Sequence, residues 1–74
     1  MKVYEIGFHV GDGIYSVNMV EAEDKQLAEL VAEKHAKRHG YTYEWIKELT
    51  DAEVEERRRK GMPKYDACRY LKRG

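Results

Sequence analysis

Basic side chains are concentrated in the last third of the 74-residue chain, where they could neutralise phosphate groups. Residues 1–49 contain six Lys/Arg against nine Asp/Glu, a balance of −3, whereas residues 50–74 contain eight against five, a balance of +3. Such a cluster is typical of surfaces that bind nucleic acid. The candidate nucleic-acid-binding residues are Arg57, Arg58, Arg59, Lys60, Lys64, Arg69, Lys72 and Arg73.

The same basic run has an alternative interpretation as a self-paired helix surface. Three pairs of opposite charge have helical i,i+4 spacing: Glu53 with Arg57, Glu55 with Arg59, and Glu56 with Lys60. Pairs at this spacing attract one another, and a bound phosphate would compete with their carboxylates. Arg58 is left without such a partner. The sequence leaves both interpretations open.

Metal ligands and nucleophiles form no complete constellation in this sequence. His35 and His39 lie four residues apart, a spacing that can place two imidazoles on one metal, but neither a Cys-x-x-Cys pair nor a Glu between them completes a site. Ser16 is expected opposite His9 in a hairpin, without a third group to orient the imidazole. We therefore expect no enzymatic activity, no metal and no cofactor.

Aromatic side chains on one strand are a further candidate surface. Tyr41, Tyr43 and Trp45 alternate along residues 41–49 and could stack on bases. The intervening positions 42, 44 and 48 are Thr, Glu and Glu, so the aromatic face is the one that we expect to be buried.

Two alternating segments, 3–10 and 14–22, are predicted to form a β-hairpin about Asp12 and Gly13, the residue types that suit a two-residue turn. The register that matches apolar faces pairs Val10 with Tyr15, Phe8 with Val17, and Ile6 with Met19. These six side chains would form one apolar floor beneath a helix.

The helix boundaries are marked by capping residues. Asp24 is expected to cap a helix over 25–39 that ends at Gly40. Its apolar stripe is Leu27, Ala28, Leu30, Val31 and His35. Thr50 and Glu53 form a capping box that starts a second helix, which ends near Lys60. Residues 64–74 fit a short strand or a helical turn equally.

These elements predict a single α+β domain over residues 1–74. We expect a ββαβ antiparallel three-stranded sheet of order 2-1-3 with one covering helix, then a short charged C-terminal helix, and 64–74 could form a loosely ordered tail. The single Cys68 excludes an internal disulfide, and no apolar run is long enough to span a membrane. The expected location is the cytoplasm.

One segment of the chain carries a resemblance to known proteins. The run VYEIGFHVGDGIYSVNMVEAEDKQLAELVAEKHAKRHGYTYEWIKELTDAEVEERRRKGMP resembles small uncharacterised proteins carried on conjugative transposons of Gram-positive bacteria. The resemblance covers about 60 residues and concerns the overall pattern. It implies a cytosolic accessory protein of a mobile element, and it implies no catalytic or binding residues.

The leading functional interpretation is a non-enzymatic protein-interaction or accessory module of a mobile element. Its partner would be an unknown protein or a second copy of the chain, bound at the unpaired edges of strands two and three. Charged residues at those edges, Glu21, Glu44 and Lys47, argue instead for a monomer. The alternative is a nucleic-acid-binding accessory protein that uses the basic C-terminal third.

Overall fold

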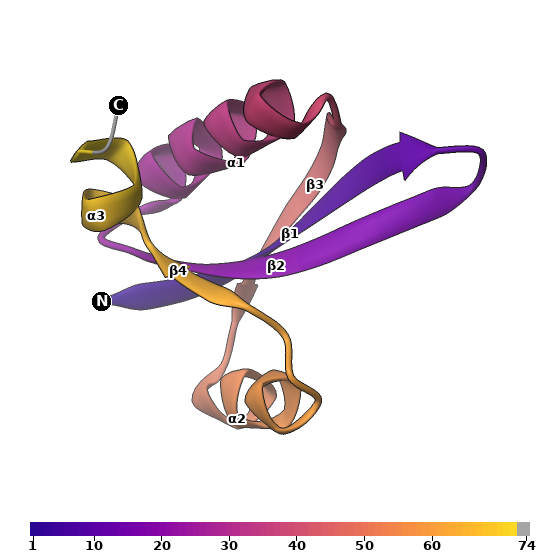
Figure 1. Cartoon of the computed structure of the whole chain (residues 1–74). Helices are drawn as coiled ribbons and strands as arrows, with labels where there is room; N and C mark the ends of the chain where they lie inside the picture. Colours follow the sequence, from indigo (N-terminus) through magenta and orange to yellow (C-terminus); the bar gives the residue numbers. More distant parts are fainter. Residues whose placement is uncertain (73–74) are drawn as a thin grey trace.

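The chain folds into a mixed four-stranded β-sheet with helices on both faces, as the computed structural model shows (Figure 1). The structure describes residues 1–72. In chain order the elements are β1 (Lys2–Gly11), β2 (Ile14–Ala22), α1 (Lys25–His39), β3 (Thr42–Leu49), α2 (Asp51–Arg59), β4 (Lys64–Asp66) and α3 (Ala67–Lys72). The predicted α+β class is confirmed.

The strand order is β3-β1-β2-β4. β1 is antiparallel to both of its neighbours, as the predicted order 2-1-3 required, but β4 adds a parallel strand beside β2. The prediction of a purely antiparallel three-stranded sheet is therefore wrong. Three residues are too few to show the alternation of a strand. β4 pairs with residues 19–21 of β2, and just before it the Pro63 carbonyl accepts a hydrogen bond from the Met19 backbone N–H at 2.8 Å.

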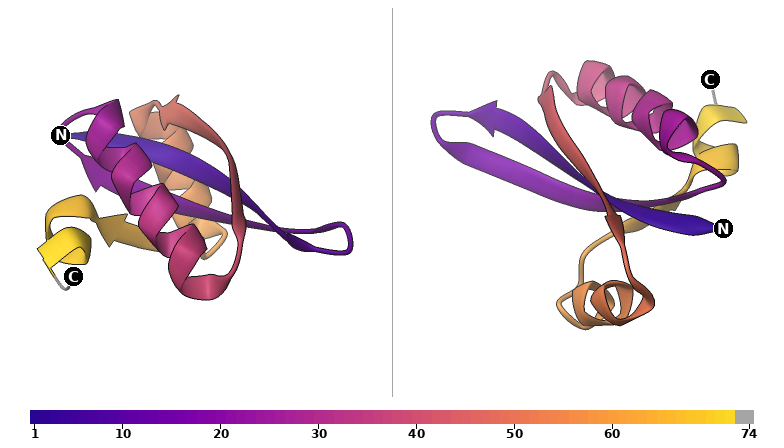
Figure 2. Two further views of the ribbon diagram at one scale, coloured as in Figure 1. Left: turned by 90° about the horizontal axis from the view of Figure 1, so that it is seen from above. Right: turned by 180° about the vertical axis from the view of Figure 1, so that it is seen from behind.

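The helices form two layers around the sheet. α1 and α3 lie on one side and α2 lies on the other (Figures 1 and 2). The sheet is therefore covered on both faces, although the sequence predicted a single covering helix. No helix within residues 1–72 is long and apolar enough to cross a membrane.

The hairpin of β1 and β2 is confirmed, but its predicted register is wrong by one residue. The observed pairs are Tyr4 with Val20, Ile6 with Asn18, Phe8 with Ser16 and His9 with Tyr15. Because side chains alternate between the faces of a strand, this difference places Val17 and Met19 on the face opposite to Ile6 and Phe8. The predicted six-residue apolar floor does not exist.

A β-bulge beside the turn causes the difference in register. The pairing shifts between His9 and Gly11, which leaves Val10 as an extra residue of β1. Asp12 and Gly13 form the expected tight turn, and both have positive φ, 45° and 75°. The turn residues alone could not predict the register, because the bulge lies between them and the paired residues.

The main hydrophobic core lies between the sheet and α1. Its buried members are Tyr4, Ile6, Phe8, Val20, Ala22, Ala28, Val31, Ala32, Ala36 and Ala67. The helix contributes mostly alanines, whose short side chains allow α1 to lie close to the strands. Leu30, which the sequence placed in the buried stripe, is 53% exposed.

Both ends of α1 agree with the prediction. The side chain of Asp24 accepts a hydrogen bond from the backbone N–H of Leu27 at 2.9 Å. Gly40 follows the last turn with φ of 74°, a left-handed conformation that glycine adopts without strain.

A second bulge, at Glu44, places Tyr43 and Trp45 of β3 on opposite faces of the sheet, and Tyr41 comes just before the strand. Tyr41 and Tyr43 pack against the main core, as predicted. Trp45 lies opposite Gly7 on the other face and is 41% exposed, so its predicted burial with the tyrosines is wrong. The extra residue at Glu44 also explains why the alternation of this segment fails after Tyr43.

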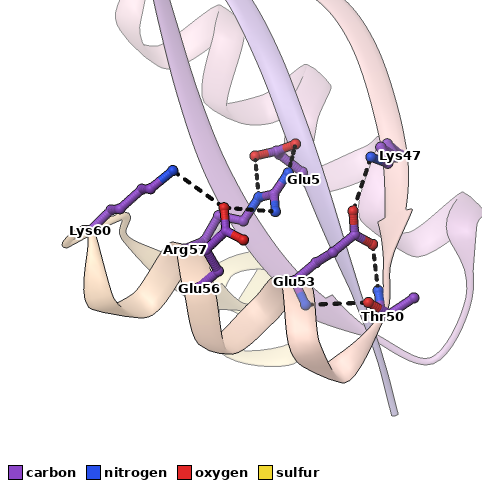
Figure 3. Close-up of polar contacts among 7 residues, drawn as sticks. All are labelled: Glu5, Lys47, Thr50, Glu53, Glu56, Arg57 and Lys60. Atoms are coloured by element: carbon purple, nitrogen blue, oxygen red, sulfur yellow. Dashed lines mark hydrogen bonds and ion pairs between the residues drawn. The ribbon is translucent and has the colours of Figure 1, made fainter.

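The capping box of α2 is confirmed. The backbone N–H of Glu53 donates to Thr50 Oγ1 at 3.2 Å, and the backbone N–H of Thr50 donates to Glu53 Oε1 at 3.0 Å (Figure 3). Lys47 Nζ donates to the same carboxylate at 3.1 Å. The Thr50 backbone N–H, and then Lys47, lower the pKa of Glu53 to about 2. The helix ends at Arg59, close to the predicted end.

The segment that fitted a strand or a helix equally contains both. Residues 64–66 form β4, and residues 67–72 form α3, which brings the fully buried Ala67 into the main core. Residues 73 and 74, the end of the expected loosely ordered tail, lie outside the described part of the chain.

Replacement of Gly7 by alanine tests the packing on the α2 side of the sheet. A Cβ atom at this position would collide with the indole ring of Trp45. We expect Gly7→Ala to lower the free energy of unfolding by about 1–3 kcal/mol, the usual cost of overpacking. Urea denaturation measures this change. In a Trp45→Ala background the same substitution should cost less than half as much, and an equal cost in both backgrounds would show that the indole is not the obstacle.

Candidate anion-binding site

A pocket of about 430 Å³ lies where the last turns of α1 meet β4 and α3. The view from above in Figure 2 shows these three elements side by side, and α1 contacts α3 directly. The pocket is lined by His35, Arg38, His39, Lys64, Tyr65, Asp66, Arg69 and Tyr70. It therefore combines three permanent cations, two imidazoles and two phenols with one carboxylate.

The helical repeat explains how α1 contributes to this pocket. His35, Arg38 and His39 have i,i+3 and i,i+4 spacing, so they lie on one face of the helix. The other lining residues belong to the C-terminal segment. They reach the pocket because β4 pairs with the end of β2 and α3 follows β4 without a loop. The site exists only when the C-terminal segment is docked on the sheet.

His35 connects the pocket to the interior of the protein. The ring is buried, its Nδ1 lies 2.8 Å from Tyr70 Oη, and its Nε2 lies 3.4 Å from Asn18 Nδ2. An amide nitrogen can only donate, so Nε2 accepts this long contact and Nδ1–H donates to the tyrosine. Burial, and then the charges of His39 and Arg38, lower the pKa of His35. The imidazole is therefore a neutral structural group that holds Tyr70 of α3 against α1.

The Tyr70 side chain contacts both His35 and Arg38. The guanidinium carbon of Arg38 lies 5.0 Å from the centre of the Tyr70 ring, which is cation–π geometry. The Tyr65 ring meets the Tyr70 ring edge-on with a centroid distance of 5.5 Å. Burial raises the pKa of Tyr70, so its hydroxyl stays protonated at neutral pH. Arg38 thus contacts an aromatic ring at the pocket, and it pairs with no carboxylate of residues 1–72.

The cations of the pocket differ from those of α2 in their pairing. Among residues 1–72, no ion pair is formed by Arg38, Lys64 or Arg69. Asp66 is the one carboxylate among the residues that line the pocket, and its Oδ1 accepts a hydrogen bond from the Arg69 backbone N–H at 3.3 Å. The pocket therefore carries an excess of positive charge.

The cations of the basic run on α2 all form ion pairs within the protein. Arg57 Nε donates to Glu5 Oε2 of β1 at 3.0 Å, an ion pair that is largely buried (Figure 3). The exposed cations pair along the helix: Arg58 with Glu55 at 3.8 Å, Arg59 with Glu55 at 3.9 Å, and Lys60 with Glu56 at 3.3 Å. Two of the three predicted i,i+4 pairs are present. The third is replaced, because Glu53 binds Lys47 and Arg57 binds Glu5.

The predicted nucleic-acid-binding residues therefore do not form one surface. Arg57, Arg58 and Arg59 lie on α2, and Lys60 is its C-cap, across the sheet from the pocket. Lys64 and Arg69 line the pocket. Lys72 is exposed on α3, and Arg73 lies outside the described residues.

Sequence analysis missed Arg38, Tyr65 and Tyr70 as members of a site. Arg38 stands in the cationic last turn of α1, where basic residues are common because they interact favourably with the helix dipole. The available signal was the spacing of His35, Arg38 and His39 on one helix face. This spacing indicates a site only if residues 64–70 pack against the same helix face, and the sequence did not predict where those residues lie.

The chain matches no protein-family model, no curated protein and no solved structure. The resemblance to small proteins of conjugative transposons therefore stays a prediction.

Truncation of Arg57 should destabilise the protein more than truncation of its neighbour Arg58. Arg57→Ala leaves the buried carboxylate of Glu5 without its partner, whereas Arg58 is exposed and pairs weakly. We expect a melting temperature lower by roughly 5 °C or more for Arg57→Ala, and by less than about 2 °C for Arg58→Ala. Thermal denaturation followed by circular dichroism measures both, and equal decreases would contradict the structural role of the Glu5 pair.

The lowered pKa of His35 predicts a dependence of stability on pH. Because the folded state disfavours the protonated imidazole, the unfolded state binds more protons below about pH 6.5, and stability falls as the pH decreases through this range. His35→Gln removes this contribution. We therefore expect the free energy of unfolding of the native protein to exceed that of the variant by less as the pH is lowered from about 7.5 to about 5, as measured by urea denaturation. A constant or widening difference would contradict the assignment.

Proposed function

We propose that this protein is a non-enzymatic module that binds nucleic acid through the pocket between α1, β4 and α3. One observation carries the proposal: Arg38, Lys64 and Arg69 converge on one pocket, and none of them forms an ion pair within residues 1–72. Cations that neighbouring carboxylates do not neutralise are available for phosphate, which is the main source of affinity in nucleic-acid binding.

The aromatic walls favour nucleic acid over an acidic protein as the partner. Tyr65 and Tyr70 line the same pocket as the cations, and aromatic rings beside cations are the combination that binds a single strand by its bases and phosphates together. The guanidinium of Arg38 is already ordered by Tyr70, so less side-chain entropy is lost when it binds phosphate. The paired cations of α2 offer no such advantage.

Binding of a protein at the sheet edges has less support. β4 pairs with β2 from Met19 to Glu21, so this part of the expected edge is already occupied. The outer edge of β3 carries Glu44, Lys47 and Glu48, all exposed, and charged edges oppose pairing with another strand. The protein-interaction function and the origin in a mobile element stay predictions from the sequence.

Fluorescence polarisation with a labelled single-stranded oligonucleotide tests the proposal. With three phosphate contacts the log–log salt slope should be about −2, which is a roughly twentyfold loss of affinity between about 50 mM and about 200 mM salt. The triple variant Arg38→Gln/Lys64→Gln/Arg69→Gln should bind much more weakly and lose most of this slope.

The basic run on α2 supplies a control of equal charge. The triple variant Arg58→Gln/Arg59→Gln/Lys60→Gln also removes three positive charges, but it should weaken binding less than about threefold, because its cations lie away from the pocket. Circular dichroism verifies that both variants fold, and Lys64→Gln alone substitutes for the pocket variant if that variant does not. Absence of binding at low salt, or an equal loss in both triple variants, would exclude the pocket as the binding site.

A further inference from the structure

The distribution of charge around the pocket carries information about which phosphate it takes. Proteins that follow a strand without base preference use a positively charged groove that extends over several nucleotides. Here the cations gather at one point: Arg38 comes from α1, Lys64 from β4 and Arg69 from α3, and all three line one pocket of about 430 Å³. The basic run of α2 lies across the sheet and cannot extend this site into a groove (Figures 1 and 2).

We propose that the pocket takes a terminal phosphate monoester joined to a nucleoside, either as a free nucleotide or at the end of a strand. This inference rests on the proposed function and names its ligand. At neutral pH a phosphate monoester carries a charge of about −1.5 to −2, whereas each internal phosphodiester carries a single charge. Three converging cations match the compact, more highly charged group better than they match a row of singly charged groups.

The chemistry of the three cations suits this assignment. Guanidinium groups such as those of Arg38 and Arg69 present fixed forks of donors that can bind two phosphate oxygens at once. The Lys64 ammonium adds a compact charge that can follow the remaining oxygen. A terminal phosphate exposes three free oxygens to such donors, and an internal phosphodiester exposes two.

The remaining lining residues fit the nucleoside. The Tyr65 and Tyr70 rings and the exposed imidazole of His39 line the same pocket. Arg38 covers one face of Tyr70 and Tyr41 stacks on His39, and the parts of the three rings that stay accessible can contact a base. The Asp66 carboxylate repels phosphate, but it can accept hydrogen bonds from sugar hydroxyls or from a base amino group. A volume of about 430 Å³ is within the range of pockets that hold small molecules of this size. The pocket therefore has a cationic part for the phosphate and a polar aromatic part for the nucleoside.

Two forms of one oligonucleotide test the inference. Fluorescence polarisation with a strand labelled at its 3′ end compares a 5′-phosphate with a 5′-hydroxyl. We expect the phosphorylated strand to bind about tenfold more tightly. Unlabelled adenosine 5′-monophosphate should compete with the labelled strand, whereas adenosine and inorganic phosphate at the same concentration should compete weakly. Competition by the nucleotide without a preference for the phosphorylated strand would identify free nucleotide as the source of the phosphate, which also supports the proposed ligand.

A pair of lysine variants connects the preference to the pocket. Lys64→Gln should bring the ratio of the two affinities close to one, whereas Lys60→Gln, which removes the same charge from α2, should leave the tenfold ratio unchanged.

The possible failures of the two proposals are distinguishable. If both strands bind equally, the nucleotide does not compete, and the pocket triple variant still loses binding, then the pocket binds internal phosphates and the inference is wrong while the proposed function stands. If neither strand and no nucleotide binds at low salt, both are wrong. Equal competition by inorganic phosphate and the nucleotide would overturn the assignment of a nucleoside to the aromatic part of the pocket.

Discussion

The fold depends on the burial of β1 in the middle of the protein. This strand pairs with β2 on one edge and with β3 on the other, and its residues 4–8 are all buried. Side chains on one face enter the core beneath α1, while Glu5 and Gly7 point to the opposite face. A central strand that is covered on both faces determines where every other element must lie. It also requires that the charge of Glu5 is paired and that the space beside Gly7, which has no side chain, is filled.

Both requirements are met by residues that arrive much later in the chain. Arg57 of α2 neutralises Glu5, and the indole of Trp45 occupies the space that the missing Cβ of Gly7 leaves. α2 is thereby tied to the underside of the sheet by an ion pair rather than by a large apolar face, since none of its residues is buried. With α2 held there, the chain returns to the edge of β2 as β4, and this return brings α3 against α1. The pocket is thus a consequence of how the central strand is covered.

The features that the sequence predicted well are those governed by neighbouring residues. The caps of α1, the capping box of α2 and the Asp12-Gly13 turn each depend on groups within about four residues of one another. The features that it missed depend on distant contacts. The bulges at Val10 and Glu44 shift the pairing of β1 with β2 and with β3, and β4 is too short to have a pattern of its own. Pattern analysis assumed one covered face, so it matched the wrong apolar residues across the hairpin.

The candidate site was obscured for the same reason. A run of four cations is conspicuous in the sequence, but each of the four forms an ion pair, three with carboxylates one turn away on α2 and Arg57 with Glu5 of β1. Arg38, Lys64 and Arg69 are scattered over 32 positions of the sequence, and only the docking of β4 and α3 brings them to one pocket. For a chain whose formal net charge is zero, the number of basic residues says little about binding. What matters is where the fold separates cations from carboxylates, and within residues 1–72 the pocket of α1, β4 and α3 is where three of them converge without an ion pair.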